Sequence, residues 1–80
     1  MKKLSEIEVH KKVKIVGLKS TGKYRIRQME MGLIPGTIVE IVKVSPFNDP
    51  LTISLRGYQL TMRKSELDLI VVEEDLWTSL

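Results

Sequence analysis

The residue types that carry most enzyme chemistry are sparse in this chain of 80 residues. His10 is the single histidine, and cysteine is absent. Without a thiolate or a second imidazole, His10 lacks the partners that a transition-metal site or a general base requires. We therefore interpret His10 as a solvated surface residue, and we predict neither a catalytic site nor a metal or cofactor site.

Two further segments partly match known ligand-binding motifs. The stretch Gly17–Lys23 contains a glycine and a Gly-Lys pair, as a phosphate-binding loop does, but Tyr24 stands where that motif needs Ser or Thr. The run Glu73-Glu74-Asp75 offers carboxylates to a hard cation, yet it lacks the ligand spacing of a calcium loop. We discard the first motif and interpret the second as a solubilising tail, so the sequence favours a binding protein over an enzyme.

Charge is divided unevenly along the chain. Residues 1–27 hold nine basic and two acidic residues, a net charge of +7. Residues 28–80 hold four basic and eight acidic residues, a net charge of −4. An acidic protein, a nucleic acid or a lipid headgroup layer would complement the basic part. A solvated face of a small domain explains the same pattern.

The apolar periodicity predicts a small, mostly β domain. We expect strands over Lys12–Leu18, Thr37–Val44 and Leu69–Val72, a hairpin over Leu51–Arg63, and one helix over Tyr24–Met31. About five strands with a single helix between the first two point to a strongly bent, SH3-like β-barrel. The length allows one domain over residues 1–80, with a core of about residues 4–73 and a tail over residues 74–80.

The predicted helix and hairpin each have an expected orientation. Ile26, Met29 and Leu33 recur three and four residues apart, which predicts the buried side of the helix. Its other side carries Arg25, Arg27 and Gln28. A two-residue turn at Gly57-Tyr58 would pair Leu55 with Leu60 and Ile53 with Met62 in the hairpin. The apolar phase of the strand over Thr37–Val44 slips, which predicts a bulge or a sharp bend.

The segment Met29–Thr37 changes the direction of the chain. Gly32 lies where a helix end favours a left-handed residue. Pro35 and Gly36 suit the two central positions of a type II turn. Together with Gly57 in the hairpin, these residues are interpreted as serving backbone geometry.

Two motifs in this order resemble a known family. The words Met31-Gly-Leu-Ile-Pro-Gly-Thr37 and Arg56-Gly-Tyr58, the latter followed by Leu60 and Arg63, are similar to the ferrous iron transport protein A family. The resemblance runs roughly from Leu4 to Glu73. It implies an SH3-like barrel with an inserted helix, acting beside the membrane permease for ferrous iron, which bears a cytosolic GTP-binding domain. The implied role is a regulatory adaptor that docks on the cytosolic part of the permease and alters its activity or assembly.

For the docking surface we predict basic and aromatic residues of the helix and of the hairpin turn, since arginine and tyrosine are common interface anchors. They are Lys23, Tyr24, Arg25, Arg27, Arg56 and Tyr58. No stretch is apolar for the length of a membrane span, and no signal peptide is recognisable, so we expect a cytoplasmic protein.

Two other functions remain open at this point. The SH3-like C-terminal domain of iron-dependent repressors suggests an iron-sensing module. A small RNA-binding barrel is the other, although no stacking platform of aromatic residues is predicted and nucleic acid is not expected as a partner. The exposed hairpin edge is one surface for self-association, and the tail residues Leu76, Trp77 and Leu80 are a second.

Overall fold

One antiparallel sheet dominates residues 1–74, the part of the chain that the computed structural model describes. In chain order the elements are β1 (Lys2–Lys3), the 3-10 turn η1 (Leu4–Glu6), β2 (Lys12–Leu18), α1 (Gly22–Glu30), β3 (Ile38–Val44), β4 (Leu51–Leu55), β5 (Tyr58–Met62), α2 (Lys64–Leu67) and β6 (Ile70–Glu73). The predicted mostly β fold with one helix between its first two long strands is confirmed, and β1 adds a sixth strand. The tail residues Leu76, Trp77 and Leu80 lie outside the described part.

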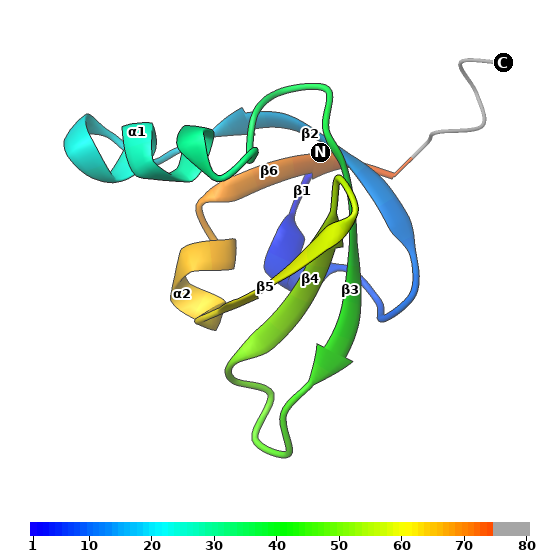
Figure 1. Ribbon diagram of the computed structural model, residues 1–80. Coiled ribbons are helices and arrows are strands. Elements are labelled where there is room, and N and C mark those ends of the chain that lie inside the picture. Colours follow the sequence, from blue (N-terminus) through cyan, green and yellow to red (C-terminus); the bar gives the residue numbers. More distant parts are fainter. Residues whose placement is uncertain (75–80) are drawn as a thin grey trace, which may run out of the picture.

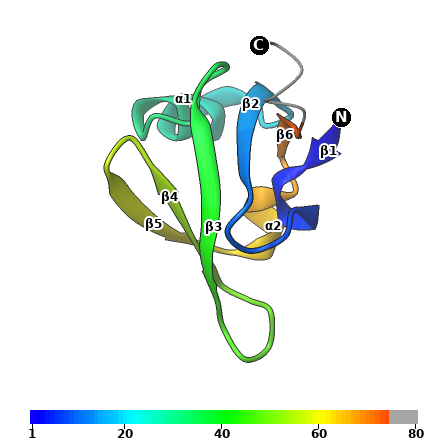
Figure 2. The same cartoon turned by 90° about the vertical axis from the view of Figure 1, so that its right-hand side faces the viewer.

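The six strands follow the order β1-β6-β2-β3-β4-β5. Figure 2 shows β4 and β5 on one side of β3, with β2 and β6 on the other. In both views α1 and the β4–β5 turn lie at one end of the molecule, and the β3–β4 loop lies at the opposite end (Figures 1 and 2). Within the described residues no pairing joins β1 to β5, so the hydrogen-bond ladder curls without closing.

Bulges in two strands bend the sheet. In β3 the pairing shifts between Ile41 and Lys43, which makes Val42 the extra residue and confirms the bulge that the slipped apolar phase predicted. In β2 the pairing shifts between Ile15 and Gly17. Because a bulge sharpens the local twist, these two positions let a short sheet wrap around its own core.

The register of the β4–β5 hairpin differs from the prediction by two residues. Leu55 pairs with Tyr58 and Ile53 with Leu60, so the turn residues are Arg56 and Gly57. Both have a positive φ, 47° and 84°, as a type I′ turn requires, and this turn matches the twist of the strands. A slip of two residues leaves every side chain on its predicted face, because side chains alternate along a strand.

The core lies inside the curl of the sheet. It unites inward residues of β2 to β6 with residues of η1, of the following loop, of α2 and of the turn after α1. Its buried apolar members are Leu4, Ile7, Val13, Ile15, Leu33, Val39, Ile41, Leu51, Ile53, Leu55, Met62, Leu67, Ile70 and Val72. The core excludes α1 itself, which lies at one end of the sheet (Figure 1). With nine residues α1 is the longest described helix, and none of the described helices has the length and apolarity to span a membrane.

Candidate functional site

The chain turns sharply between α1 and β3. The Thr37 N–H donates to the Ile34 carbonyl at 3.1 Å, which closes a four-residue turn with Pro35 and Gly36 at its centre. Gly36 has a φ of 95°, as the third position of a type II turn demands. The Gly36 N–H donates to the Ile15 carbonyl at 2.7 Å, so this turn is fastened to β2.

Gly32 is the point where the two sequence motifs meet. Its φ is 95°, and a Cβ placed on it would lie 3.5 Å from Arg56 Cδ and 3.5 Å from the Tyr58 hydroxyl. Thr37 Oγ1 donates to the Gly32 carbonyl at 3.0 Å and accepts from Arg56 Nη2 at 3.4 Å. The β4–β5 turn therefore packs on the end of α1, a contact that the spacing of the motifs did not reveal.

The orientation predicted for α1 is wrong. Ile26 is 57% exposed and Met29 is 41% exposed, whereas Gln28 is fully buried. The buried Ser20 hydroxyl donates to Gln28 Oε1 at 2.5 Å, and Gln28 Nε2 donates to the Tyr24 hydroxyl at 3.5 Å. A polar anchor thus holds the inner side of the helix, and its apolar side faces outward.

Tyr24 connects α1 to α2. Its hydroxyl donates to Glu66 Oε2 at 2.7 Å. Burial, together with the neighbouring Glu66 carboxylate, raises the pKa of Tyr24 from 10.0 to about 12. Tyr24 is therefore half-buried between the two helices, and its hydroxyl is already bonded to Glu66.

The raised pKa predicts a loss of stability in alkaline solution. Since folding favours the protonated phenol, its stabilising effect is complete below pH 10 and is lost as the pH rises toward about 12. We expect this loss to disappear in Tyr24→Phe. In a Tyr58→Phe background Tyr24 is the sole tyrosine, and the phenolate absorbance should titrate near pH 12. A midpoint at the ordinary value, or one unchanged by Glu66→Gln, would contradict the link between the helices.

The outward side of α1 combines cations with apolar groups. Lys23, Arg25 and Arg27 are exposed, and within residues 1–74 none of them forms an ion pair. Ile26 and Met29 lie between them. We call these five residues the α1 face. The structure brings the predicted Arg56 and Tyr58 to the same end of the molecule through their contact with Gly32.

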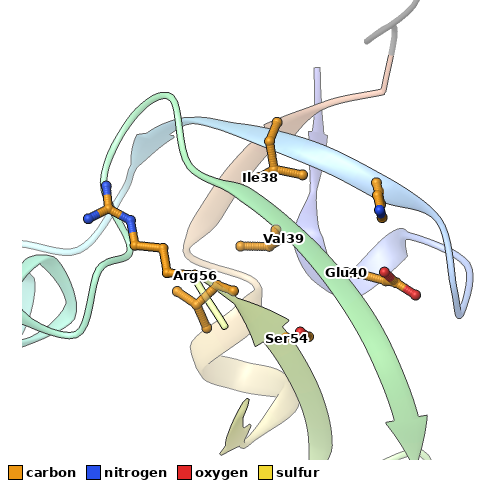
Figure 3. A pocket seen from close by; sticks show the side chains of 7 residues that line it. Ile38, Val39, Glu40, Ser54 and Arg56 are labelled. Atoms are coloured by element: carbon orange, nitrogen blue, oxygen red, sulfur yellow. The ribbon is translucent and has the colours of Figure 1, made fainter. Parts of the chain in front are cut away.

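A groove of about 240 Å³ runs over the outer face of β2, β3 and β4 (Figure 3). Strand pairing places Lys12 beside Glu40 and Glu40 beside Ser54. Arg56 is directed away from Glu40 (Figure 3). His10 lies at the surface, with Nδ1 3.4 Å from Glu40 Oε2. Sequence reasoning missed this groove because its row of polar residues depends on the register of three strands.

In residues 1–74 no three His, Asp or Glu side chains are grouped in a way that could hold a metal ion. The end of the molecule that carries the α1 face presents exposed guanidinium groups with apolar side chains beside them.

Comparisons with known proteins agree with this description. The model of the FeoA domain matches residues 2–74. A fusion protein of Fe(2+) transport protein A and the Fe(2+) transporter FeoB from Porphyromonas gingivalis is 30% identical over 71 residues, which are 89% of this chain and 8% of that protein. The chain therefore spans a small part of this relative.

Solved structures share the fold. The FeoA-like protein from Clostridium acetobutylicum is 41% identical, with a TM-score of 0.84 over 94% of this chain and 87% of that one. FeoA from Stenotrophomonas maltophilia, described as a procaryotic SH3 domain protein, is 24% identical, with a TM-score of 0.77 over 88% of this chain and 87% of that one. The SH3-like architecture that the sequence predicted is thereby confirmed.

Proposed function

Because this chain belongs to the FeoA family, we propose that it is a non-enzymatic, cytoplasmic accessory protein of ferrous iron transport that docks on the cytosolic GTP-binding part of the FeoB transporter and modulates it. The observation that carries this proposal is the Porphyromonas gingivalis fusion protein, which joins Fe(2+) transport protein A and FeoB in one chain. Fusion holds two segments at a high effective concentration, which benefits segments that work in contact.

The α1 face supports the docking role. Its cations, Lys23, Arg25 and Arg27, flank the exposed Ile26 and Met29. Interfaces are commonly anchored by arginine and by apolar groups that become desolvated together. Because α1 is held from its inner side, this outer side is available without rearrangement of the core. Arg56 and Tyr58 lie at the same end of the molecule and enlarge this docking surface. A complementary surface on the partner would be acidic.

Reversal of two charges tests the surface. We expect Arg25→Glu with Arg27→Glu to weaken binding to the isolated cytosolic domain of FeoB by about tenfold or more, since exposed cations would become repulsive toward an acidic surface. Calorimetry with GDP and with a non-hydrolysable GTP analogue would measure this. Lys43→Glu, an exposed charge reversal near the end of β3 that leads into the β3–β4 loop, is the control and should leave the affinity unchanged.

Two outcomes would count against the proposal. If the wild-type chain fails to bind the domain with either nucleotide, the docking site on FeoB is refuted. If the double variant binds as tightly as the wild type, the α1 face is not part of the interface. Modulation is tested separately, because GTP turnover by the domain should change when the wild-type chain saturates it.

The two alternatives receive no comparable support. An RNA-binding sheet needs aromatic residues on one platform. Phe47 lies instead in the loop before β4, whereas Tyr58 is the first residue of β5, beyond the other end of β4. An iron-sensing module needs several grouped metal ligands, and no group of three or more His, Asp or Glu side chains occurs within residues 1–74.

A further inference from the structure

The loop between β3 and β4 projects from the end of the molecule opposite α1 (Figures 1 and 2). Its sequence is Ser45-Pro-Phe-Asn-Asp-Pro50. Phe47 near its tip is 89% exposed, as much as the first residue of the chain. Phe47 thus keeps a large apolar area in water, and transfer of that area to an apolar environment would be favourable.

Hydrogen bonds hold this loop in place. The Asn48 N–H donates to the Ser45 carbonyl at 2.9 Å, and the Asp49 N–H donates to Ser45 Oγ at 2.9 Å. From outside the loop, the Lys64 N–H donates to Asp49 Oδ1 at 2.9 Å. Phe47 therefore points into solvent from a loop that hydrogen bonds hold in place. No change in the core is needed to expose it.

Three cations lie near the base of the loop. Lys43, Arg63 and Lys64 are exposed there. Two carboxylates lie beside these three cations and leave a net positive charge: Asp49 Oδ1 is 3.7 Å from Arg63 Nε, and Glu66 Oε1 accepts from the Arg63 N–H at 2.9 Å. The loop thus carries an aromatic residue at its tip and cations at its base. We call Lys43, Arg63 and Lys64 the cationic collar.

A hollow of about 210 Å³ lies beside the collar. It is lined by Lys43, Ser45, Pro50, Thr52 and Thr61. The hydroxyls of Thr52 and Thr61 are 3.1 Å apart. An ammonium group and several hydroxyls are suitable donors to the phosphate of a phospholipid headgroup.

We propose that the β3–β4 loop is a membrane-contacting tip, which inserts Phe47 at the boundary of the acyl chains while Lys43, Arg63 and Lys64 engage anionic headgroups. The order of apolar tip and cationic collar matches the order of layers in an anionic membrane surface. A single aromatic with few cations gives weak, reversible contact, which suits a second point of attachment. The proposal rests on the proposed function in one respect, since docking on a transporter would bring the chain beside a membrane.

Vesicle binding by the full chain tests the proposal. We expect the wild type to partition onto vesicles that contain anionic phosphatidylglycerol, to bind less to pure phosphatidylcholine, and to be released by salt. Phe47→Ser should reduce partitioning about tenfold through the loss of buried apolar area. Arg63→Gln should reduce it about fivefold, and on anionic vesicles alone. Ile26→Ser, an exposed apolar residue at the opposite end, is the matched control and should bind normally.

A spectroscopic probe reports insertion directly. In Phe47→Trp combined with Trp77→Phe, the single tryptophan should shift to shorter emission wavelengths on anionic vesicles and be quenched by lipids brominated along the acyl chain. No partitioning of the wild type at low salt, or equal partitioning of wild type and Phe47→Ser, overturns the proposal. So does a loss of affinity of Phe47→Ser for the soluble FeoB domain without lipid, which would assign Phe47 to a protein contact. Because the vesicles contain no FeoB, failure of docking and failure of membrane contact are distinguishable.

Discussion

Leu33→Ala should lower the free energy of unfolding by about 3 kcal/mol. Leu33 is fully buried, and its N–H donates to the Gln28 carbonyl at 3.1 Å. Truncation removes apolar contacts and leaves a cavity beneath the turn that follows α1. In a domain of this size the total stability is about 5–15 kcal/mol, so the loss is a large share. Urea unfolding followed by circular dichroism would measure it.

The neighbouring residue provides the control. Ile34 lies in the same turn but is half-buried and does not belong to the core. Ile34→Ala should therefore cost clearly less than Leu33→Ala. Equal losses would mean that the turn as a whole, and not the insertion of Leu33 into the core, holds this part of the chain.

Gln28→Ala should cost about 2 kcal/mol, although the substituted residue lies on a surface helix. The change leaves the buried Ser20 hydroxyl without its acceptor and removes the contact to Tyr24. It should also loosen α1, so that its amide hydrogens exchange faster while those of β3 and β4 are unaffected. Unfolding in urea and hydrogen exchange are the two measurements.

A double substitution sharpens this prediction. Ser20→Ala together with Gln28→Ala removes both polar partners, and it should cost less than the sum of the single changes. Ile26→Ala, an exposed change on the same helix, should stay within about 0.5 kcal/mol of the wild type. Strict additivity of the first pair would refute the buried hydrogen bond as the anchor of α1.

The parts of the fold that depend on local pattern were predictable. Alternation of apolar residues identified β4 and β5, and the slipped phase predicted a bulge in β3, which the structure places at Val42. The hairpin turn was misplaced because Arg56 adopts a positive φ that sequence rules assign to glycine or asparagine. The short strand β1 escaped prediction, since two lysines carry no strand pattern and depend on β6 for pairing.

The orientation of α1 could not be read from its own residues. Over two turns, the spacing of Ile26 and Met29 fits a buried face as well as an exposed one. The side of α1 that faces inward is set by Gln28, whose burial depends on its hydrogen bond with Ser20 before the helix. In the same way, the contact of Gly32 with Arg56 and Tyr58 joins segments that only the folded sheet brings together. The docking residues remain predictions, now with a defined position on the molecule.

The strand order has a consequence for how the chain acquires its structure. The meander β3–β4–β5 joins neighbours in sequence, so it can form early at a small cost in loop entropy. By contrast β6 pairs with both β1 and β2, and these pairings close almost the whole described chain into one loop. During synthesis β1 therefore stays without its partner, and β2 stays open on one side, until β6 leaves the ribosome.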